Sequence, residues 1–212
     1  MAAIACVTLT WMAVLGLLVS EYSGSRSGVW MTKPLAATGF LAAALVSGAL
    51  ASTYGTWILV GLALSLLGDV LLIPRESKSA FRAGVLSFLL GHVAYAIAFL
   101  IRGVSPLAVV LAAVVLIGPA WVVLRWLRPN VGPDMRVPVH AYVGVISVMV
   151  VLAVGTVAAH GGTNILVGAL MFYFSDLAVA RERFVEHTFT NKAWGLPLYF
   201  GGQLVLALSV AG

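Results

Sequence analysis

Residues 62–73 read LALSLLGDVLLI, and residues 165–180 read ILVGALMFYFSDLAVA. Each stretch is apolar except for an aspartate near its end, Asp69 in the first and Asp176 in the second. A carboxylate inside a bilayer costs at least about 2.5–3.5 kcal/mol on insertion scales, so an acid in such a segment usually has a function and faces the protein interior. The two stretches therefore predict spanning helices that carry functional acids.

The composition of the whole chain is that of an integral membrane protein. Hydrophobic residues make up 62% of the 212 residues and charged residues only 9%, whereas soluble domains average about 25% charged residues. The apolar runs are continuous rather than alternating, which favours helices over a transmembrane barrel. We therefore predict an all-α, polytopic bundle that forms a single integral membrane domain over residues 1–212. The single cysteine, Cys6, excludes an internal disulfide and a cysteine-based metal site.

Eight apolar segments are long enough to span a bilayer, which requires roughly 20 residues per helix. We interpret the first as a spanning helix rather than a signal peptide, because no Lys or Arg precedes its apolar core. The predicted helices cover residues 2–20, 34–51, 55–73, 80–101, 106–127, 138–158, 163–180 and 193–211.

The basic residues fall almost entirely on one side of this arrangement. Of the 12 Lys and Arg residues, all but Arg102 lie in or beside the first, third, fifth and seventh of the loops between predicted helices. Cytoplasmic loops carry such an excess, so we predict a multi-pass protein of the plasma membrane with both termini outside the cytoplasm. Topology thus accounts for the net charge of +5, and we expect no nucleic-acid partner.

A weak internal repeat relates the two halves of the chain. Asp69 parallels Asp176 at an offset of 107 residues, and His92 parallels Gln203 at an offset of 111 residues. Parallel duplications of this kind occur in membrane proteins. A four-plus-four arrangement would bring both aspartates to equivalent positions just below the cytoplasmic boundary.

The two aspartates are the candidate catalytic residues. Two nearby carboxylates in a low dielectric cannot both ionise easily, so one can stay protonated and act as an acid. The alternative is that each acid only binds a neighbouring helix, a contact worth about 0.6–2 kcal/mol. Tyr173 stands three residues before Asp176, so its phenol is expected to orient that carboxylate. The full set of side chains expected to orient the acids or a water molecule is His92, Tyr95, Tyr173, Ser175 and Gln203.

A basic rim is predicted on the cytoplasmic side. Lys33 opens the second predicted helix, with Pro34 in its first turn, where proline is common. We expect Lys33, Arg82, Arg181 and Lys192 to bind a phosphate or a lipid headgroup. The alternative for each is interfacial anchoring, in which the charged end of the side chain reaches the membrane surface.

A metal centre is the other chemistry considered. Asp69, Asp176 and His92 could supply three ligands, but hydrolytic zinc usually takes more imidazoles. The sequence contains no Gly-x-Ser-x-Gly, no His-Glu-x-x-His and no phosphate-binding glycine loop. We therefore expect neither a metal nor a cofactor.

An ordered set of short motifs runs through most of the chain: Lys33-Pro34, Gly68-Asp69-Val70-Leu71-Leu72, Phe81, Gly84, Phe88, His92, Tyr95, Phe99, Ser175-Asp176 and Gly202-Gln203. Together these motifs resemble the YhhN-type lysoplasmalogenase family of eight-helix membrane proteins. The resemblance implies hydrolysis of the vinyl ether bond of a lysoplasmalogen to a fatty aldehyde and a glycerophospho-headgroup. We therefore expect Asp69 and Asp176 to share the acid and base roles, without a cofactor, on a lysophospholipid that enters from the cytoplasmic leaflet.

Two other classes of function remain open at this point. The same aspartates could serve a proton-coupled transporter of a lipid or small amphiphile, because buried Asp and His residues also relay protons. A scaffold would tolerate replacement of both acids. The sequence leaves open which aspartate is the acid, the headgroup and chain preference, and the oligomeric state.

Overall fold

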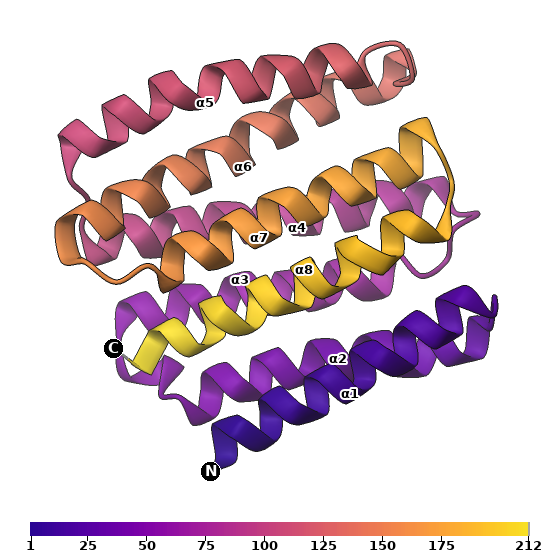
Figure 1. The fold of residues 1–212 in the computed structure, drawn as a ribbon, viewed down its shortest axis with the longest axis horizontal. Coiled ribbons are helices and arrows are strands. Elements are labelled where there is room, and N and C mark those ends of the chain that lie inside the picture. Colours follow the sequence, from indigo (N-terminus) through magenta and orange to yellow (C-terminus); the bar gives the residue numbers. More distant parts are fainter. Residues whose placement is uncertain (212) are drawn as a thin grey trace.

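The structure is a computed structural model that describes residues 1–211, and its long helices run antiparallel to their neighbours in sequence (Figure 1). All eight are long and apolar enough to cross a membrane. The predicted all-α bundle of eight spanning helices is confirmed. The helices are α1 (Ala2–Tyr22), α2 (Arg26–Val46), α3 (Thr53–Leu71), α4 (Lys78–Arg102), α5 (Pro106–Leu127), α6 (Pro133–His160), α7 (Asn164–Ala180) and α8 (Phe189–Leu208).

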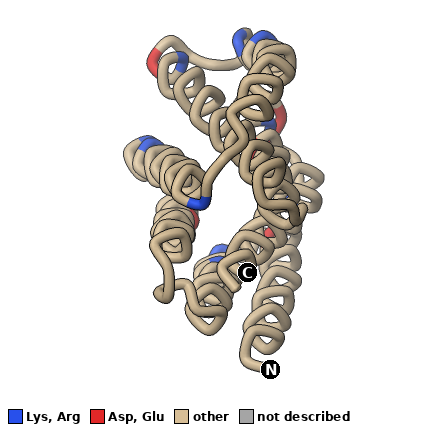
Figure 2. Tube along the Cα trace, turned by 90° about the vertical axis from the view of Figure 1, so that its left-hand side faces the viewer, with Lys and Arg blue, Asp and Glu red and all other residues tan. Residues whose placement is uncertain are grey.

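Consecutive helices pair as hairpins, α1 with α2, α3 with α4, α5 with α6 and α7 with α8. The hairpins are joined because α8 packs on α1 and α2, while α6 packs on α4 and α7. Both termini lie at one end of the bundle in Figure 1, and the four hairpin loops lie at the other. Viewed from the end with the termini, the helices carry few charged residues along their length (Figure 2). The side of the membrane that each end faces, and the internal repeat, stay predictions.

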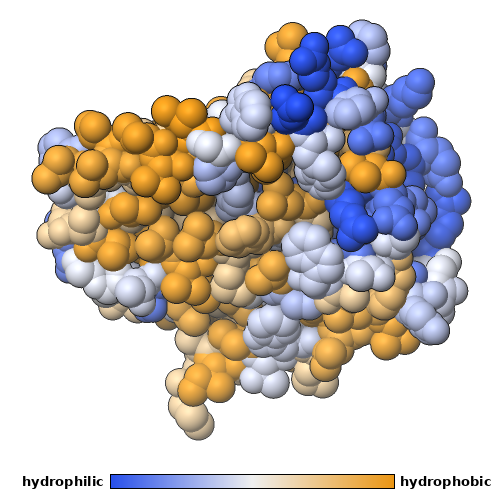
Figure 3. Space-filling model, turned by 45° about the horizontal axis from the view of Figure 1, so that its top comes forward, coloured by the Kyte–Doolittle hydropathy of each residue, from blue (hydrophilic) through white to orange (hydrophobic). Residues whose placement is uncertain are grey.

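Helix α5 stands at the edge of the bundle. It packs mainly on α6 and buries only Leu127. Large apolar side chains on its surface, among them Leu111, Val115 and Trp121, are exposed. Figure 3 shows broad hydrophobic surface over one part of the molecule and hydrophilic residues gathered at one end. Because these apolar side chains are exposed on a helix long enough to span a membrane, we expect lipid chains to contact them.

Glycines set close helix contacts in two of the hairpins. A Cβ atom on Gly202 of α8 would lie 2.9 Å from the carbonyl oxygen of Gly168 in α7, and one on Gly91 of α4 would lie 3.3 Å from the carbonyl oxygen of Gly61 in α3. Small residues let membrane helices approach this closely. Gly61 and Gly168 each stand eight residues before one of the two aspartates. These two helix crossings therefore fix the positions of Asp69 on α3 and Asp176 on α7 relative to α4 and α8.

Helix α2 begins eight residues earlier than predicted. The side chain of Ser25 accepts a hydrogen bond from the backbone N–H of Gly28 at 3.2 Å and so caps the helix. Lys33 and Pro34 consequently lie inside α2, which corrects the prediction that they open it. Proline has no N–H, so the carbonyl of Trp30, four residues earlier, lacks its usual helical partner.

Other helix ends also differ from the predicted ones. The second helix ends at Val46, and Gly48, at φ +88°, leads into a 3₁₀ turn, Ala49–Ala51, before α3 starts at Thr53. Helix α6 starts at Pro133 rather than at residue 138, and α8 starts at Phe189 rather than at residue 193. The first turns of these helices are polar or contain proline, so hydropathy alone places their starts too late.

Candidate active site

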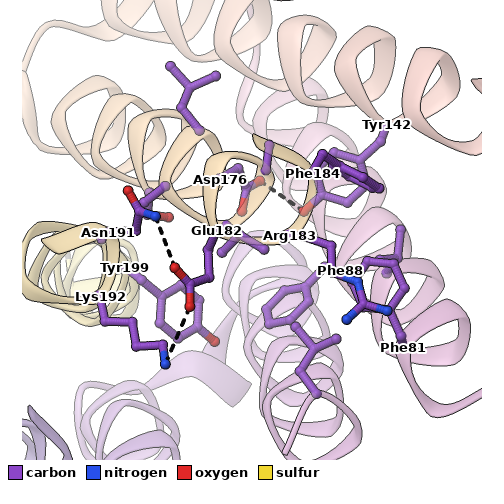
Figure 4. Close-up of a pocket in the computed structure, with 18 of the residues that line it drawn as sticks. Phe81, Phe88, Tyr142, Asp176, Glu182, Arg183, Phe184, Asn191, Lys192 and Tyr199 are labelled. Carbon is purple, nitrogen blue, oxygen red and sulfur yellow. Dashed lines mark hydrogen bonds and ion pairs between the residues drawn. The ribbon is translucent and has the colours of Figure 1, made fainter. Parts of the chain in front are cut away.

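One cavity reaches both intramembrane aspartates. It has a volume of about 400 Å³ and extends from Arg75 and His187, near the hairpin loops, to Asp69 and Asp176 inside the bundle. Several of the side chains that line it are seen in Figure 4. Its apolar lining includes Leu72, Phe81, Val85, Phe88, Val139, Val143, Ile146 and Leu177.

Asp69 is held near the end of α3 by partners from two other helices. Its side chain is only 2% exposed, and Nζ of Lys33 on α2 lies 3.2 Å from its Oδ1. Lys33 also donates to the backbone carbonyl of Asp69 at 3.2 Å. The hydroxyl of Tyr199 on α8 donates to Oδ2 at 2.6 Å. A cation therefore faces this carboxylate, and both of its oxygens have partners.

Asp176 on α7 has a different environment. Its side chain is 16% exposed, and its Oδ2 lies 3.0 Å from Nε2 of His92 on α4. The hydroxyl of Tyr142 on α6 donates to the same oxygen at 2.8 Å. Both contacts go to Oδ2, so Oδ1 is left for water or for a bound ligand. No lysine or arginine pairs with Asp176 among residues 1–211.

His92 fits this site as a hydrogen-bond donor through Nε2. Its ring is fully buried, and Nε2 lies 3.0 Å from both the Tyr142 hydroxyl and Oδ2 of Asp176. A proton on Nε2 satisfies these contacts, whereas Nδ1 has no hydrogen-bond partner within the part of the chain that the structure describes. A second proton on Nδ1 would be a buried donor without an acceptor. The geometry thus favours the Nε2–H form, which orients Asp176.

Aromatic rings separate the two carboxylates. The ring centroid of Phe172 lies 5.4 Å from that of Tyr199 and 4.4 Å from that of His92. No hydrogen bond joins Asp69 to Asp176 within residues 1–211. The two acids are therefore separately held groups that face one cavity.

The other side chains expected to orient the acids have different partners. Tyr95 donates to Oε1 of Gln203 at 2.6 Å, and neither residue lines the cavity. Ser175 lines the cavity, but its hydroxyl donates at 2.7 Å to the carbonyl of Phe172 in its own helix. These three residues support the packing around the acids rather than contact them.

Tyr173 does not orient Asp176, which corrects the expectation from their spacing. Tyr173 lines the cavity, but its buried hydroxyl has no hydrogen-bond partner among the described residues. Its ring packs edge-on against Phe174 at a centroid distance of 5.9 Å. Tyr142 contacts the carboxylate instead, because α6 packs beside α7.

Only two of the four cations of the predicted basic rim line the cavity, Lys33 and Lys192. Arg82 pairs with Asp134 at 2.5 Å and Arg181 with Glu186 at 2.8 Å, and neither arginine lines the cavity. Exposed pairs of this kind contribute about 0–1 kcal/mol. The headgroup role expected for Arg82 and Arg181 therefore has no support from the geometry.

A network of charged groups surrounds Lys192 at the mouth of the cavity. Its Nζ lies 3.0 Å from Oε2 of Glu21 and 3.4 Å from Oε1 of Glu182. Arg75 also pairs with Glu21. Glu182 further accepts hydrogen bonds from the side chain of Asn191 at 2.9 Å, as Figure 4 shows, and from the backbone of Thr188 at 3.0 Å. This network ties the start of α8 to the end of α1.

Sequence reasoning missed Tyr142 and the contact of Tyr199 with Asp69. Tyr142 lies in a long apolar helix without a motif and is 34 positions from Asp176, while Tyr199 is 130 positions from Asp69. The predicted repeat offers one signal for Tyr142, because offsets of 107 to 111 residues place the counterpart of Lys33 between residues 140 and 144. No group of three His, Cys, Asp or Glu residues that could hold a metal ion occurs within residues 1–211.

Comparison with known proteins identifies the family. The model of the YhhN family matches residues 28–210. The chain belongs to the YhhN family. The resemblance noted from the motifs is thereby confirmed, and the match includes Lys33, His92, Tyr142 and Tyr199, the polar partners of the two aspartates described above.

Curated proteins that are similar to this chain carry the name lysoplasmalogenase. Lysoplasmalogenase TMEM86A of Bos taurus is 33% identical over 162 residues, which cover 73% of this chain and 65% of that protein. Lysoplasmalogenase of Mycobacterium tuberculosis is 31% identical over 179 residues, which cover 81% and 67%. The chain thus spans about two thirds of the length of these relatives. No solved structure matches it significantly.

Proposed function

We propose that this YhhN-family protein hydrolyses the vinyl ether bond of a lysoplasmalogen-type lysophospholipid. The observation that carries the proposal is a single cavity in which two separately held carboxylates lie beneath a charged mouth. The names of the curated relatives point to the same reaction.

The cavity suits a single-chain lipid. Its walls, with Phe88, Val143 and Ile146, offer apolar contacts to a hydrocarbon chain, and its mouth carries charged groups such as Arg75 and Lys192. Ligand sites of this kind are largely apolar and contain a few well-placed polar groups. A lysolipid would thus bind with its chain among the helices and its headgroup at the mouth.

The reaction needs an acid more than a nucleophile. Protonation of the β-carbon of the vinyl ether gives an oxocarbenium ion at the carbon bonded to oxygen. Water adds to that carbon, and the hemiacetal breaks down to the aldehyde and the glycerol hydroxyl. A carboxylic acid that donates the proton and a carboxylate that stabilises the cation and accepts a proton from water are the two groups used in glycoside hydrolysis.

The environments of the two acids support a division of these roles. Lys33 faces Asp69 with a positive charge, which suits the carboxylate that stabilises the cation and activates water. Asp176 receives its hydrogen bonds on Oδ2 only, so Oδ1 is available to carry and donate a proton. We assign Asp176 as the proton donor and Asp69 as the carboxylate, with His92 and Tyr142 as positioning residues for Asp176.

The proposed location follows the distribution of basic residues. The hairpin loops around the cavity mouth, together with the helix ends next to them, carry most of the Lys and Arg residues of the chain. We therefore propose a multi-pass protein of the plasma membrane whose site opens toward the cytoplasmic leaflet.

The test is an assay of aldehyde release from an alkenyl lysophospholipid by the protein purified in detergent. General acid catalysis contributes about 10²–10⁴-fold, so Asp176→Asn and Asp69→Asn should each lose activity on that scale. In heavy water the aldehyde should gain one deuterium on the carbon next to the carbonyl. The matched control is Asp134→Asn, which removes an exposed acid outside the cavity.

The controls also separate this proposal from its alternatives. The corresponding alkyl ether lysolipid, which lacks the double bond, should not be cleaved. Aldehyde release that persists in both aspartate variants would refute the assigned mechanism. A folded wild-type protein that moves lipid across vesicles and releases no aldehyde would instead be a transporter.

A further inference from the structure

Arg183, at the mouth of the cavity, differs from the other cations there in its contacts. Three of the cations that line the cavity are paired with carboxylates: Lys33 with Asp69, Arg75 with Glu21, and Lys192 with both glutamates of the charged network. Arg183 also lines the cavity, and no carboxylate pairs with it among residues 1–211.

Local backbone geometry directs Arg183 toward the cavity. Helix α7 continues into a five-residue π-helical turn, Arg181–Val185, in which the backbone N–H of Glu186 bonds the carbonyl of Arg181 at 2.8 Å. Single π turns occur frequently at functional sites. Within this turn Phe184 packs edge-on against Phe81 of α4 at a centroid distance of 6.3 Å. Arg181, in the same turn, pairs with Glu186 and does not line the cavity.

The guanidinium of Arg183 lies over the ring of Phe81, 4.1 Å from its centroid, as the close-up in Figure 4 shows. Stacking on an aromatic face holds the plane of a guanidinium and leaves its edge N–H groups available to an anion. Those five donors match the oxygens of a phosphate group. The site therefore presents an oriented anion receptor at the place where the headgroup of a bound lysolipid would lie.

We propose that Arg183 binds the phosphate of the lysophospholipid headgroup and so makes the protein select phosphate-bearing lipids over neutral glycerol ethers. This inference rests on the proposed function, because it assumes a lysolipid in the cavity. It replaces the headgroup role expected for Arg82 and Arg181. Lys33 and Lys192, whose charges are balanced by Asp69 and by Glu21 and Glu182, provide the polar surroundings rather than the anion contact.

Binding of two ligands that the protein does not cleave tests the proposal. One is an alkyl ether lysophosphocholine, and the other is the matching alkyl glycerol ether, which has the same chain and no phosphate. Hydrogen bonds to charged groups imply a loss of about 10- to 100-fold in affinity for the phospholipid in Arg183→Gln. Affinity for the glycerol ether should stay the same. Arg181→Gln, a matched loss of charge in the same turn, should bind both ligands as the wild type does.

The proposal would be overturned by unchanged phospholipid affinity in Arg183→Gln, by an equal loss for both ligands in a folded variant, or by the same loss in Arg181→Gln. Arg183→Lys keeps the charge without the planar fork, and an intermediate affinity is expected for it. Excess inorganic phosphate should leave lysolipid binding nearly unchanged. If phosphate displaces the phospholipid but not the glycerol ether, the site belongs to free phosphate instead. Because neither ligand is cleaved, these results remain readable even if no aldehyde release is found.

Discussion

Nε2 of His92 lies 3.0 Å from Oδ2 of Asp176, although the two residues are 84 positions apart in the sequence. The contact joins α4 to α7 and places a buried imidazole directly behind a carboxylate that lines the cavity. Tyr142 adds a second donor to the same oxygen from α6. Three helices thus fix the orientation of one acid, and the first two predictions follow from this arrangement.

Replacement of His92 by Gln tests whether the imidazole positions Asp176. An amide can still donate to Oδ2, so His92→Gln should retain more activity than His92→Leu, which has no donor. In metal sites, loss of a residue that orients a ligand by a hydrogen bond costs about 10–100-fold, and we expect a similar loss of kcat in the leucine variant. KM should change little, because His92 does not line the cavity. A raised KM with unchanged kcat would mean that His92 shapes the binding site instead.

The pair Tyr142→Phe and Tyr173→Phe distinguishes the two tyrosines near Asp176. Removal of the Tyr142 hydroxyl deletes a 2.8 Å hydrogen bond to the carboxylate, so kcat should fall about 10-fold. Removal of the Tyr173 hydroxyl deletes no hydrogen bond within the described chain, so its effect should be below about 2-fold. Steady-state aldehyde release measures both. The reverse order would show that Tyr173 turns toward the acid when substrate binds.

The ion pair between Lys33 and Asp69 should contribute to stability as well as to activity. Removal of one partner of a buried pair costs about 3–5 kcal/mol, because the other charge is left uncompensated. Lys33→Gln should therefore lower the unfolding temperature in detergent clearly. The double variant Lys33→Gln with Asp69→Asn should recover much of that stability but no activity. If the two losses of stability simply add, the pair does not interact in the folded protein.

The crossing of α7 and α8 should not tolerate a side chain at Gly202. A Cβ there would lie 2.9 Å from the carbonyl oxygen of Gly168, a backbone atom that cannot turn away. We expect Gly202→Ala to lower the free energy of unfolding by about 1–3 kcal/mol, the usual effect of overpacking. Gly118→Ala in α5 is the control, since no atom lies within 4 Å of its added Cβ. If both variants were instead more stable than the wild type, the higher helix propensity of alanine, and not the crossing, would decide the effect at Gly202.

The sequence predicted the eight helices well, because long apolar runs and polar loops report directly on a membrane bundle. It also singled out Asp69, Asp176 and His92, since a polar residue in such a run stands out. It could not predict which tyrosine donates a hydrogen bond to which aspartate. Tyr142, Tyr173 and other tyrosines are equally compatible with packing, and only the crossing of helices far apart in sequence selects among them.

For the basic residues at the cavity mouth, too, the sequence does not predict which side chain contacts which partner. Arg181 and Arg183 are two positions apart in one loop, and charge counting treats them alike. The π turn after α7 separates them, because one pairs with Glu186 and the other stacks on Phe81. A turn of this kind depends on packing across the bundle, so hydropathy and charge patterns do not report it.

The partners of each carboxylate come from distant parts of the chain. Asp69 is held by Lys33 of α2 and by Tyr199 of α8, whereas Asp176 is held by His92 of α4 and Tyr142 of α6. During synthesis Lys33 and Asp69 enter the membrane before Tyr199, which follows with α8. A nascent chain that stops before α8 would therefore lack one hydrogen-bond partner of Asp69, so the surroundings of this carboxylate are complete only after α8 has been inserted.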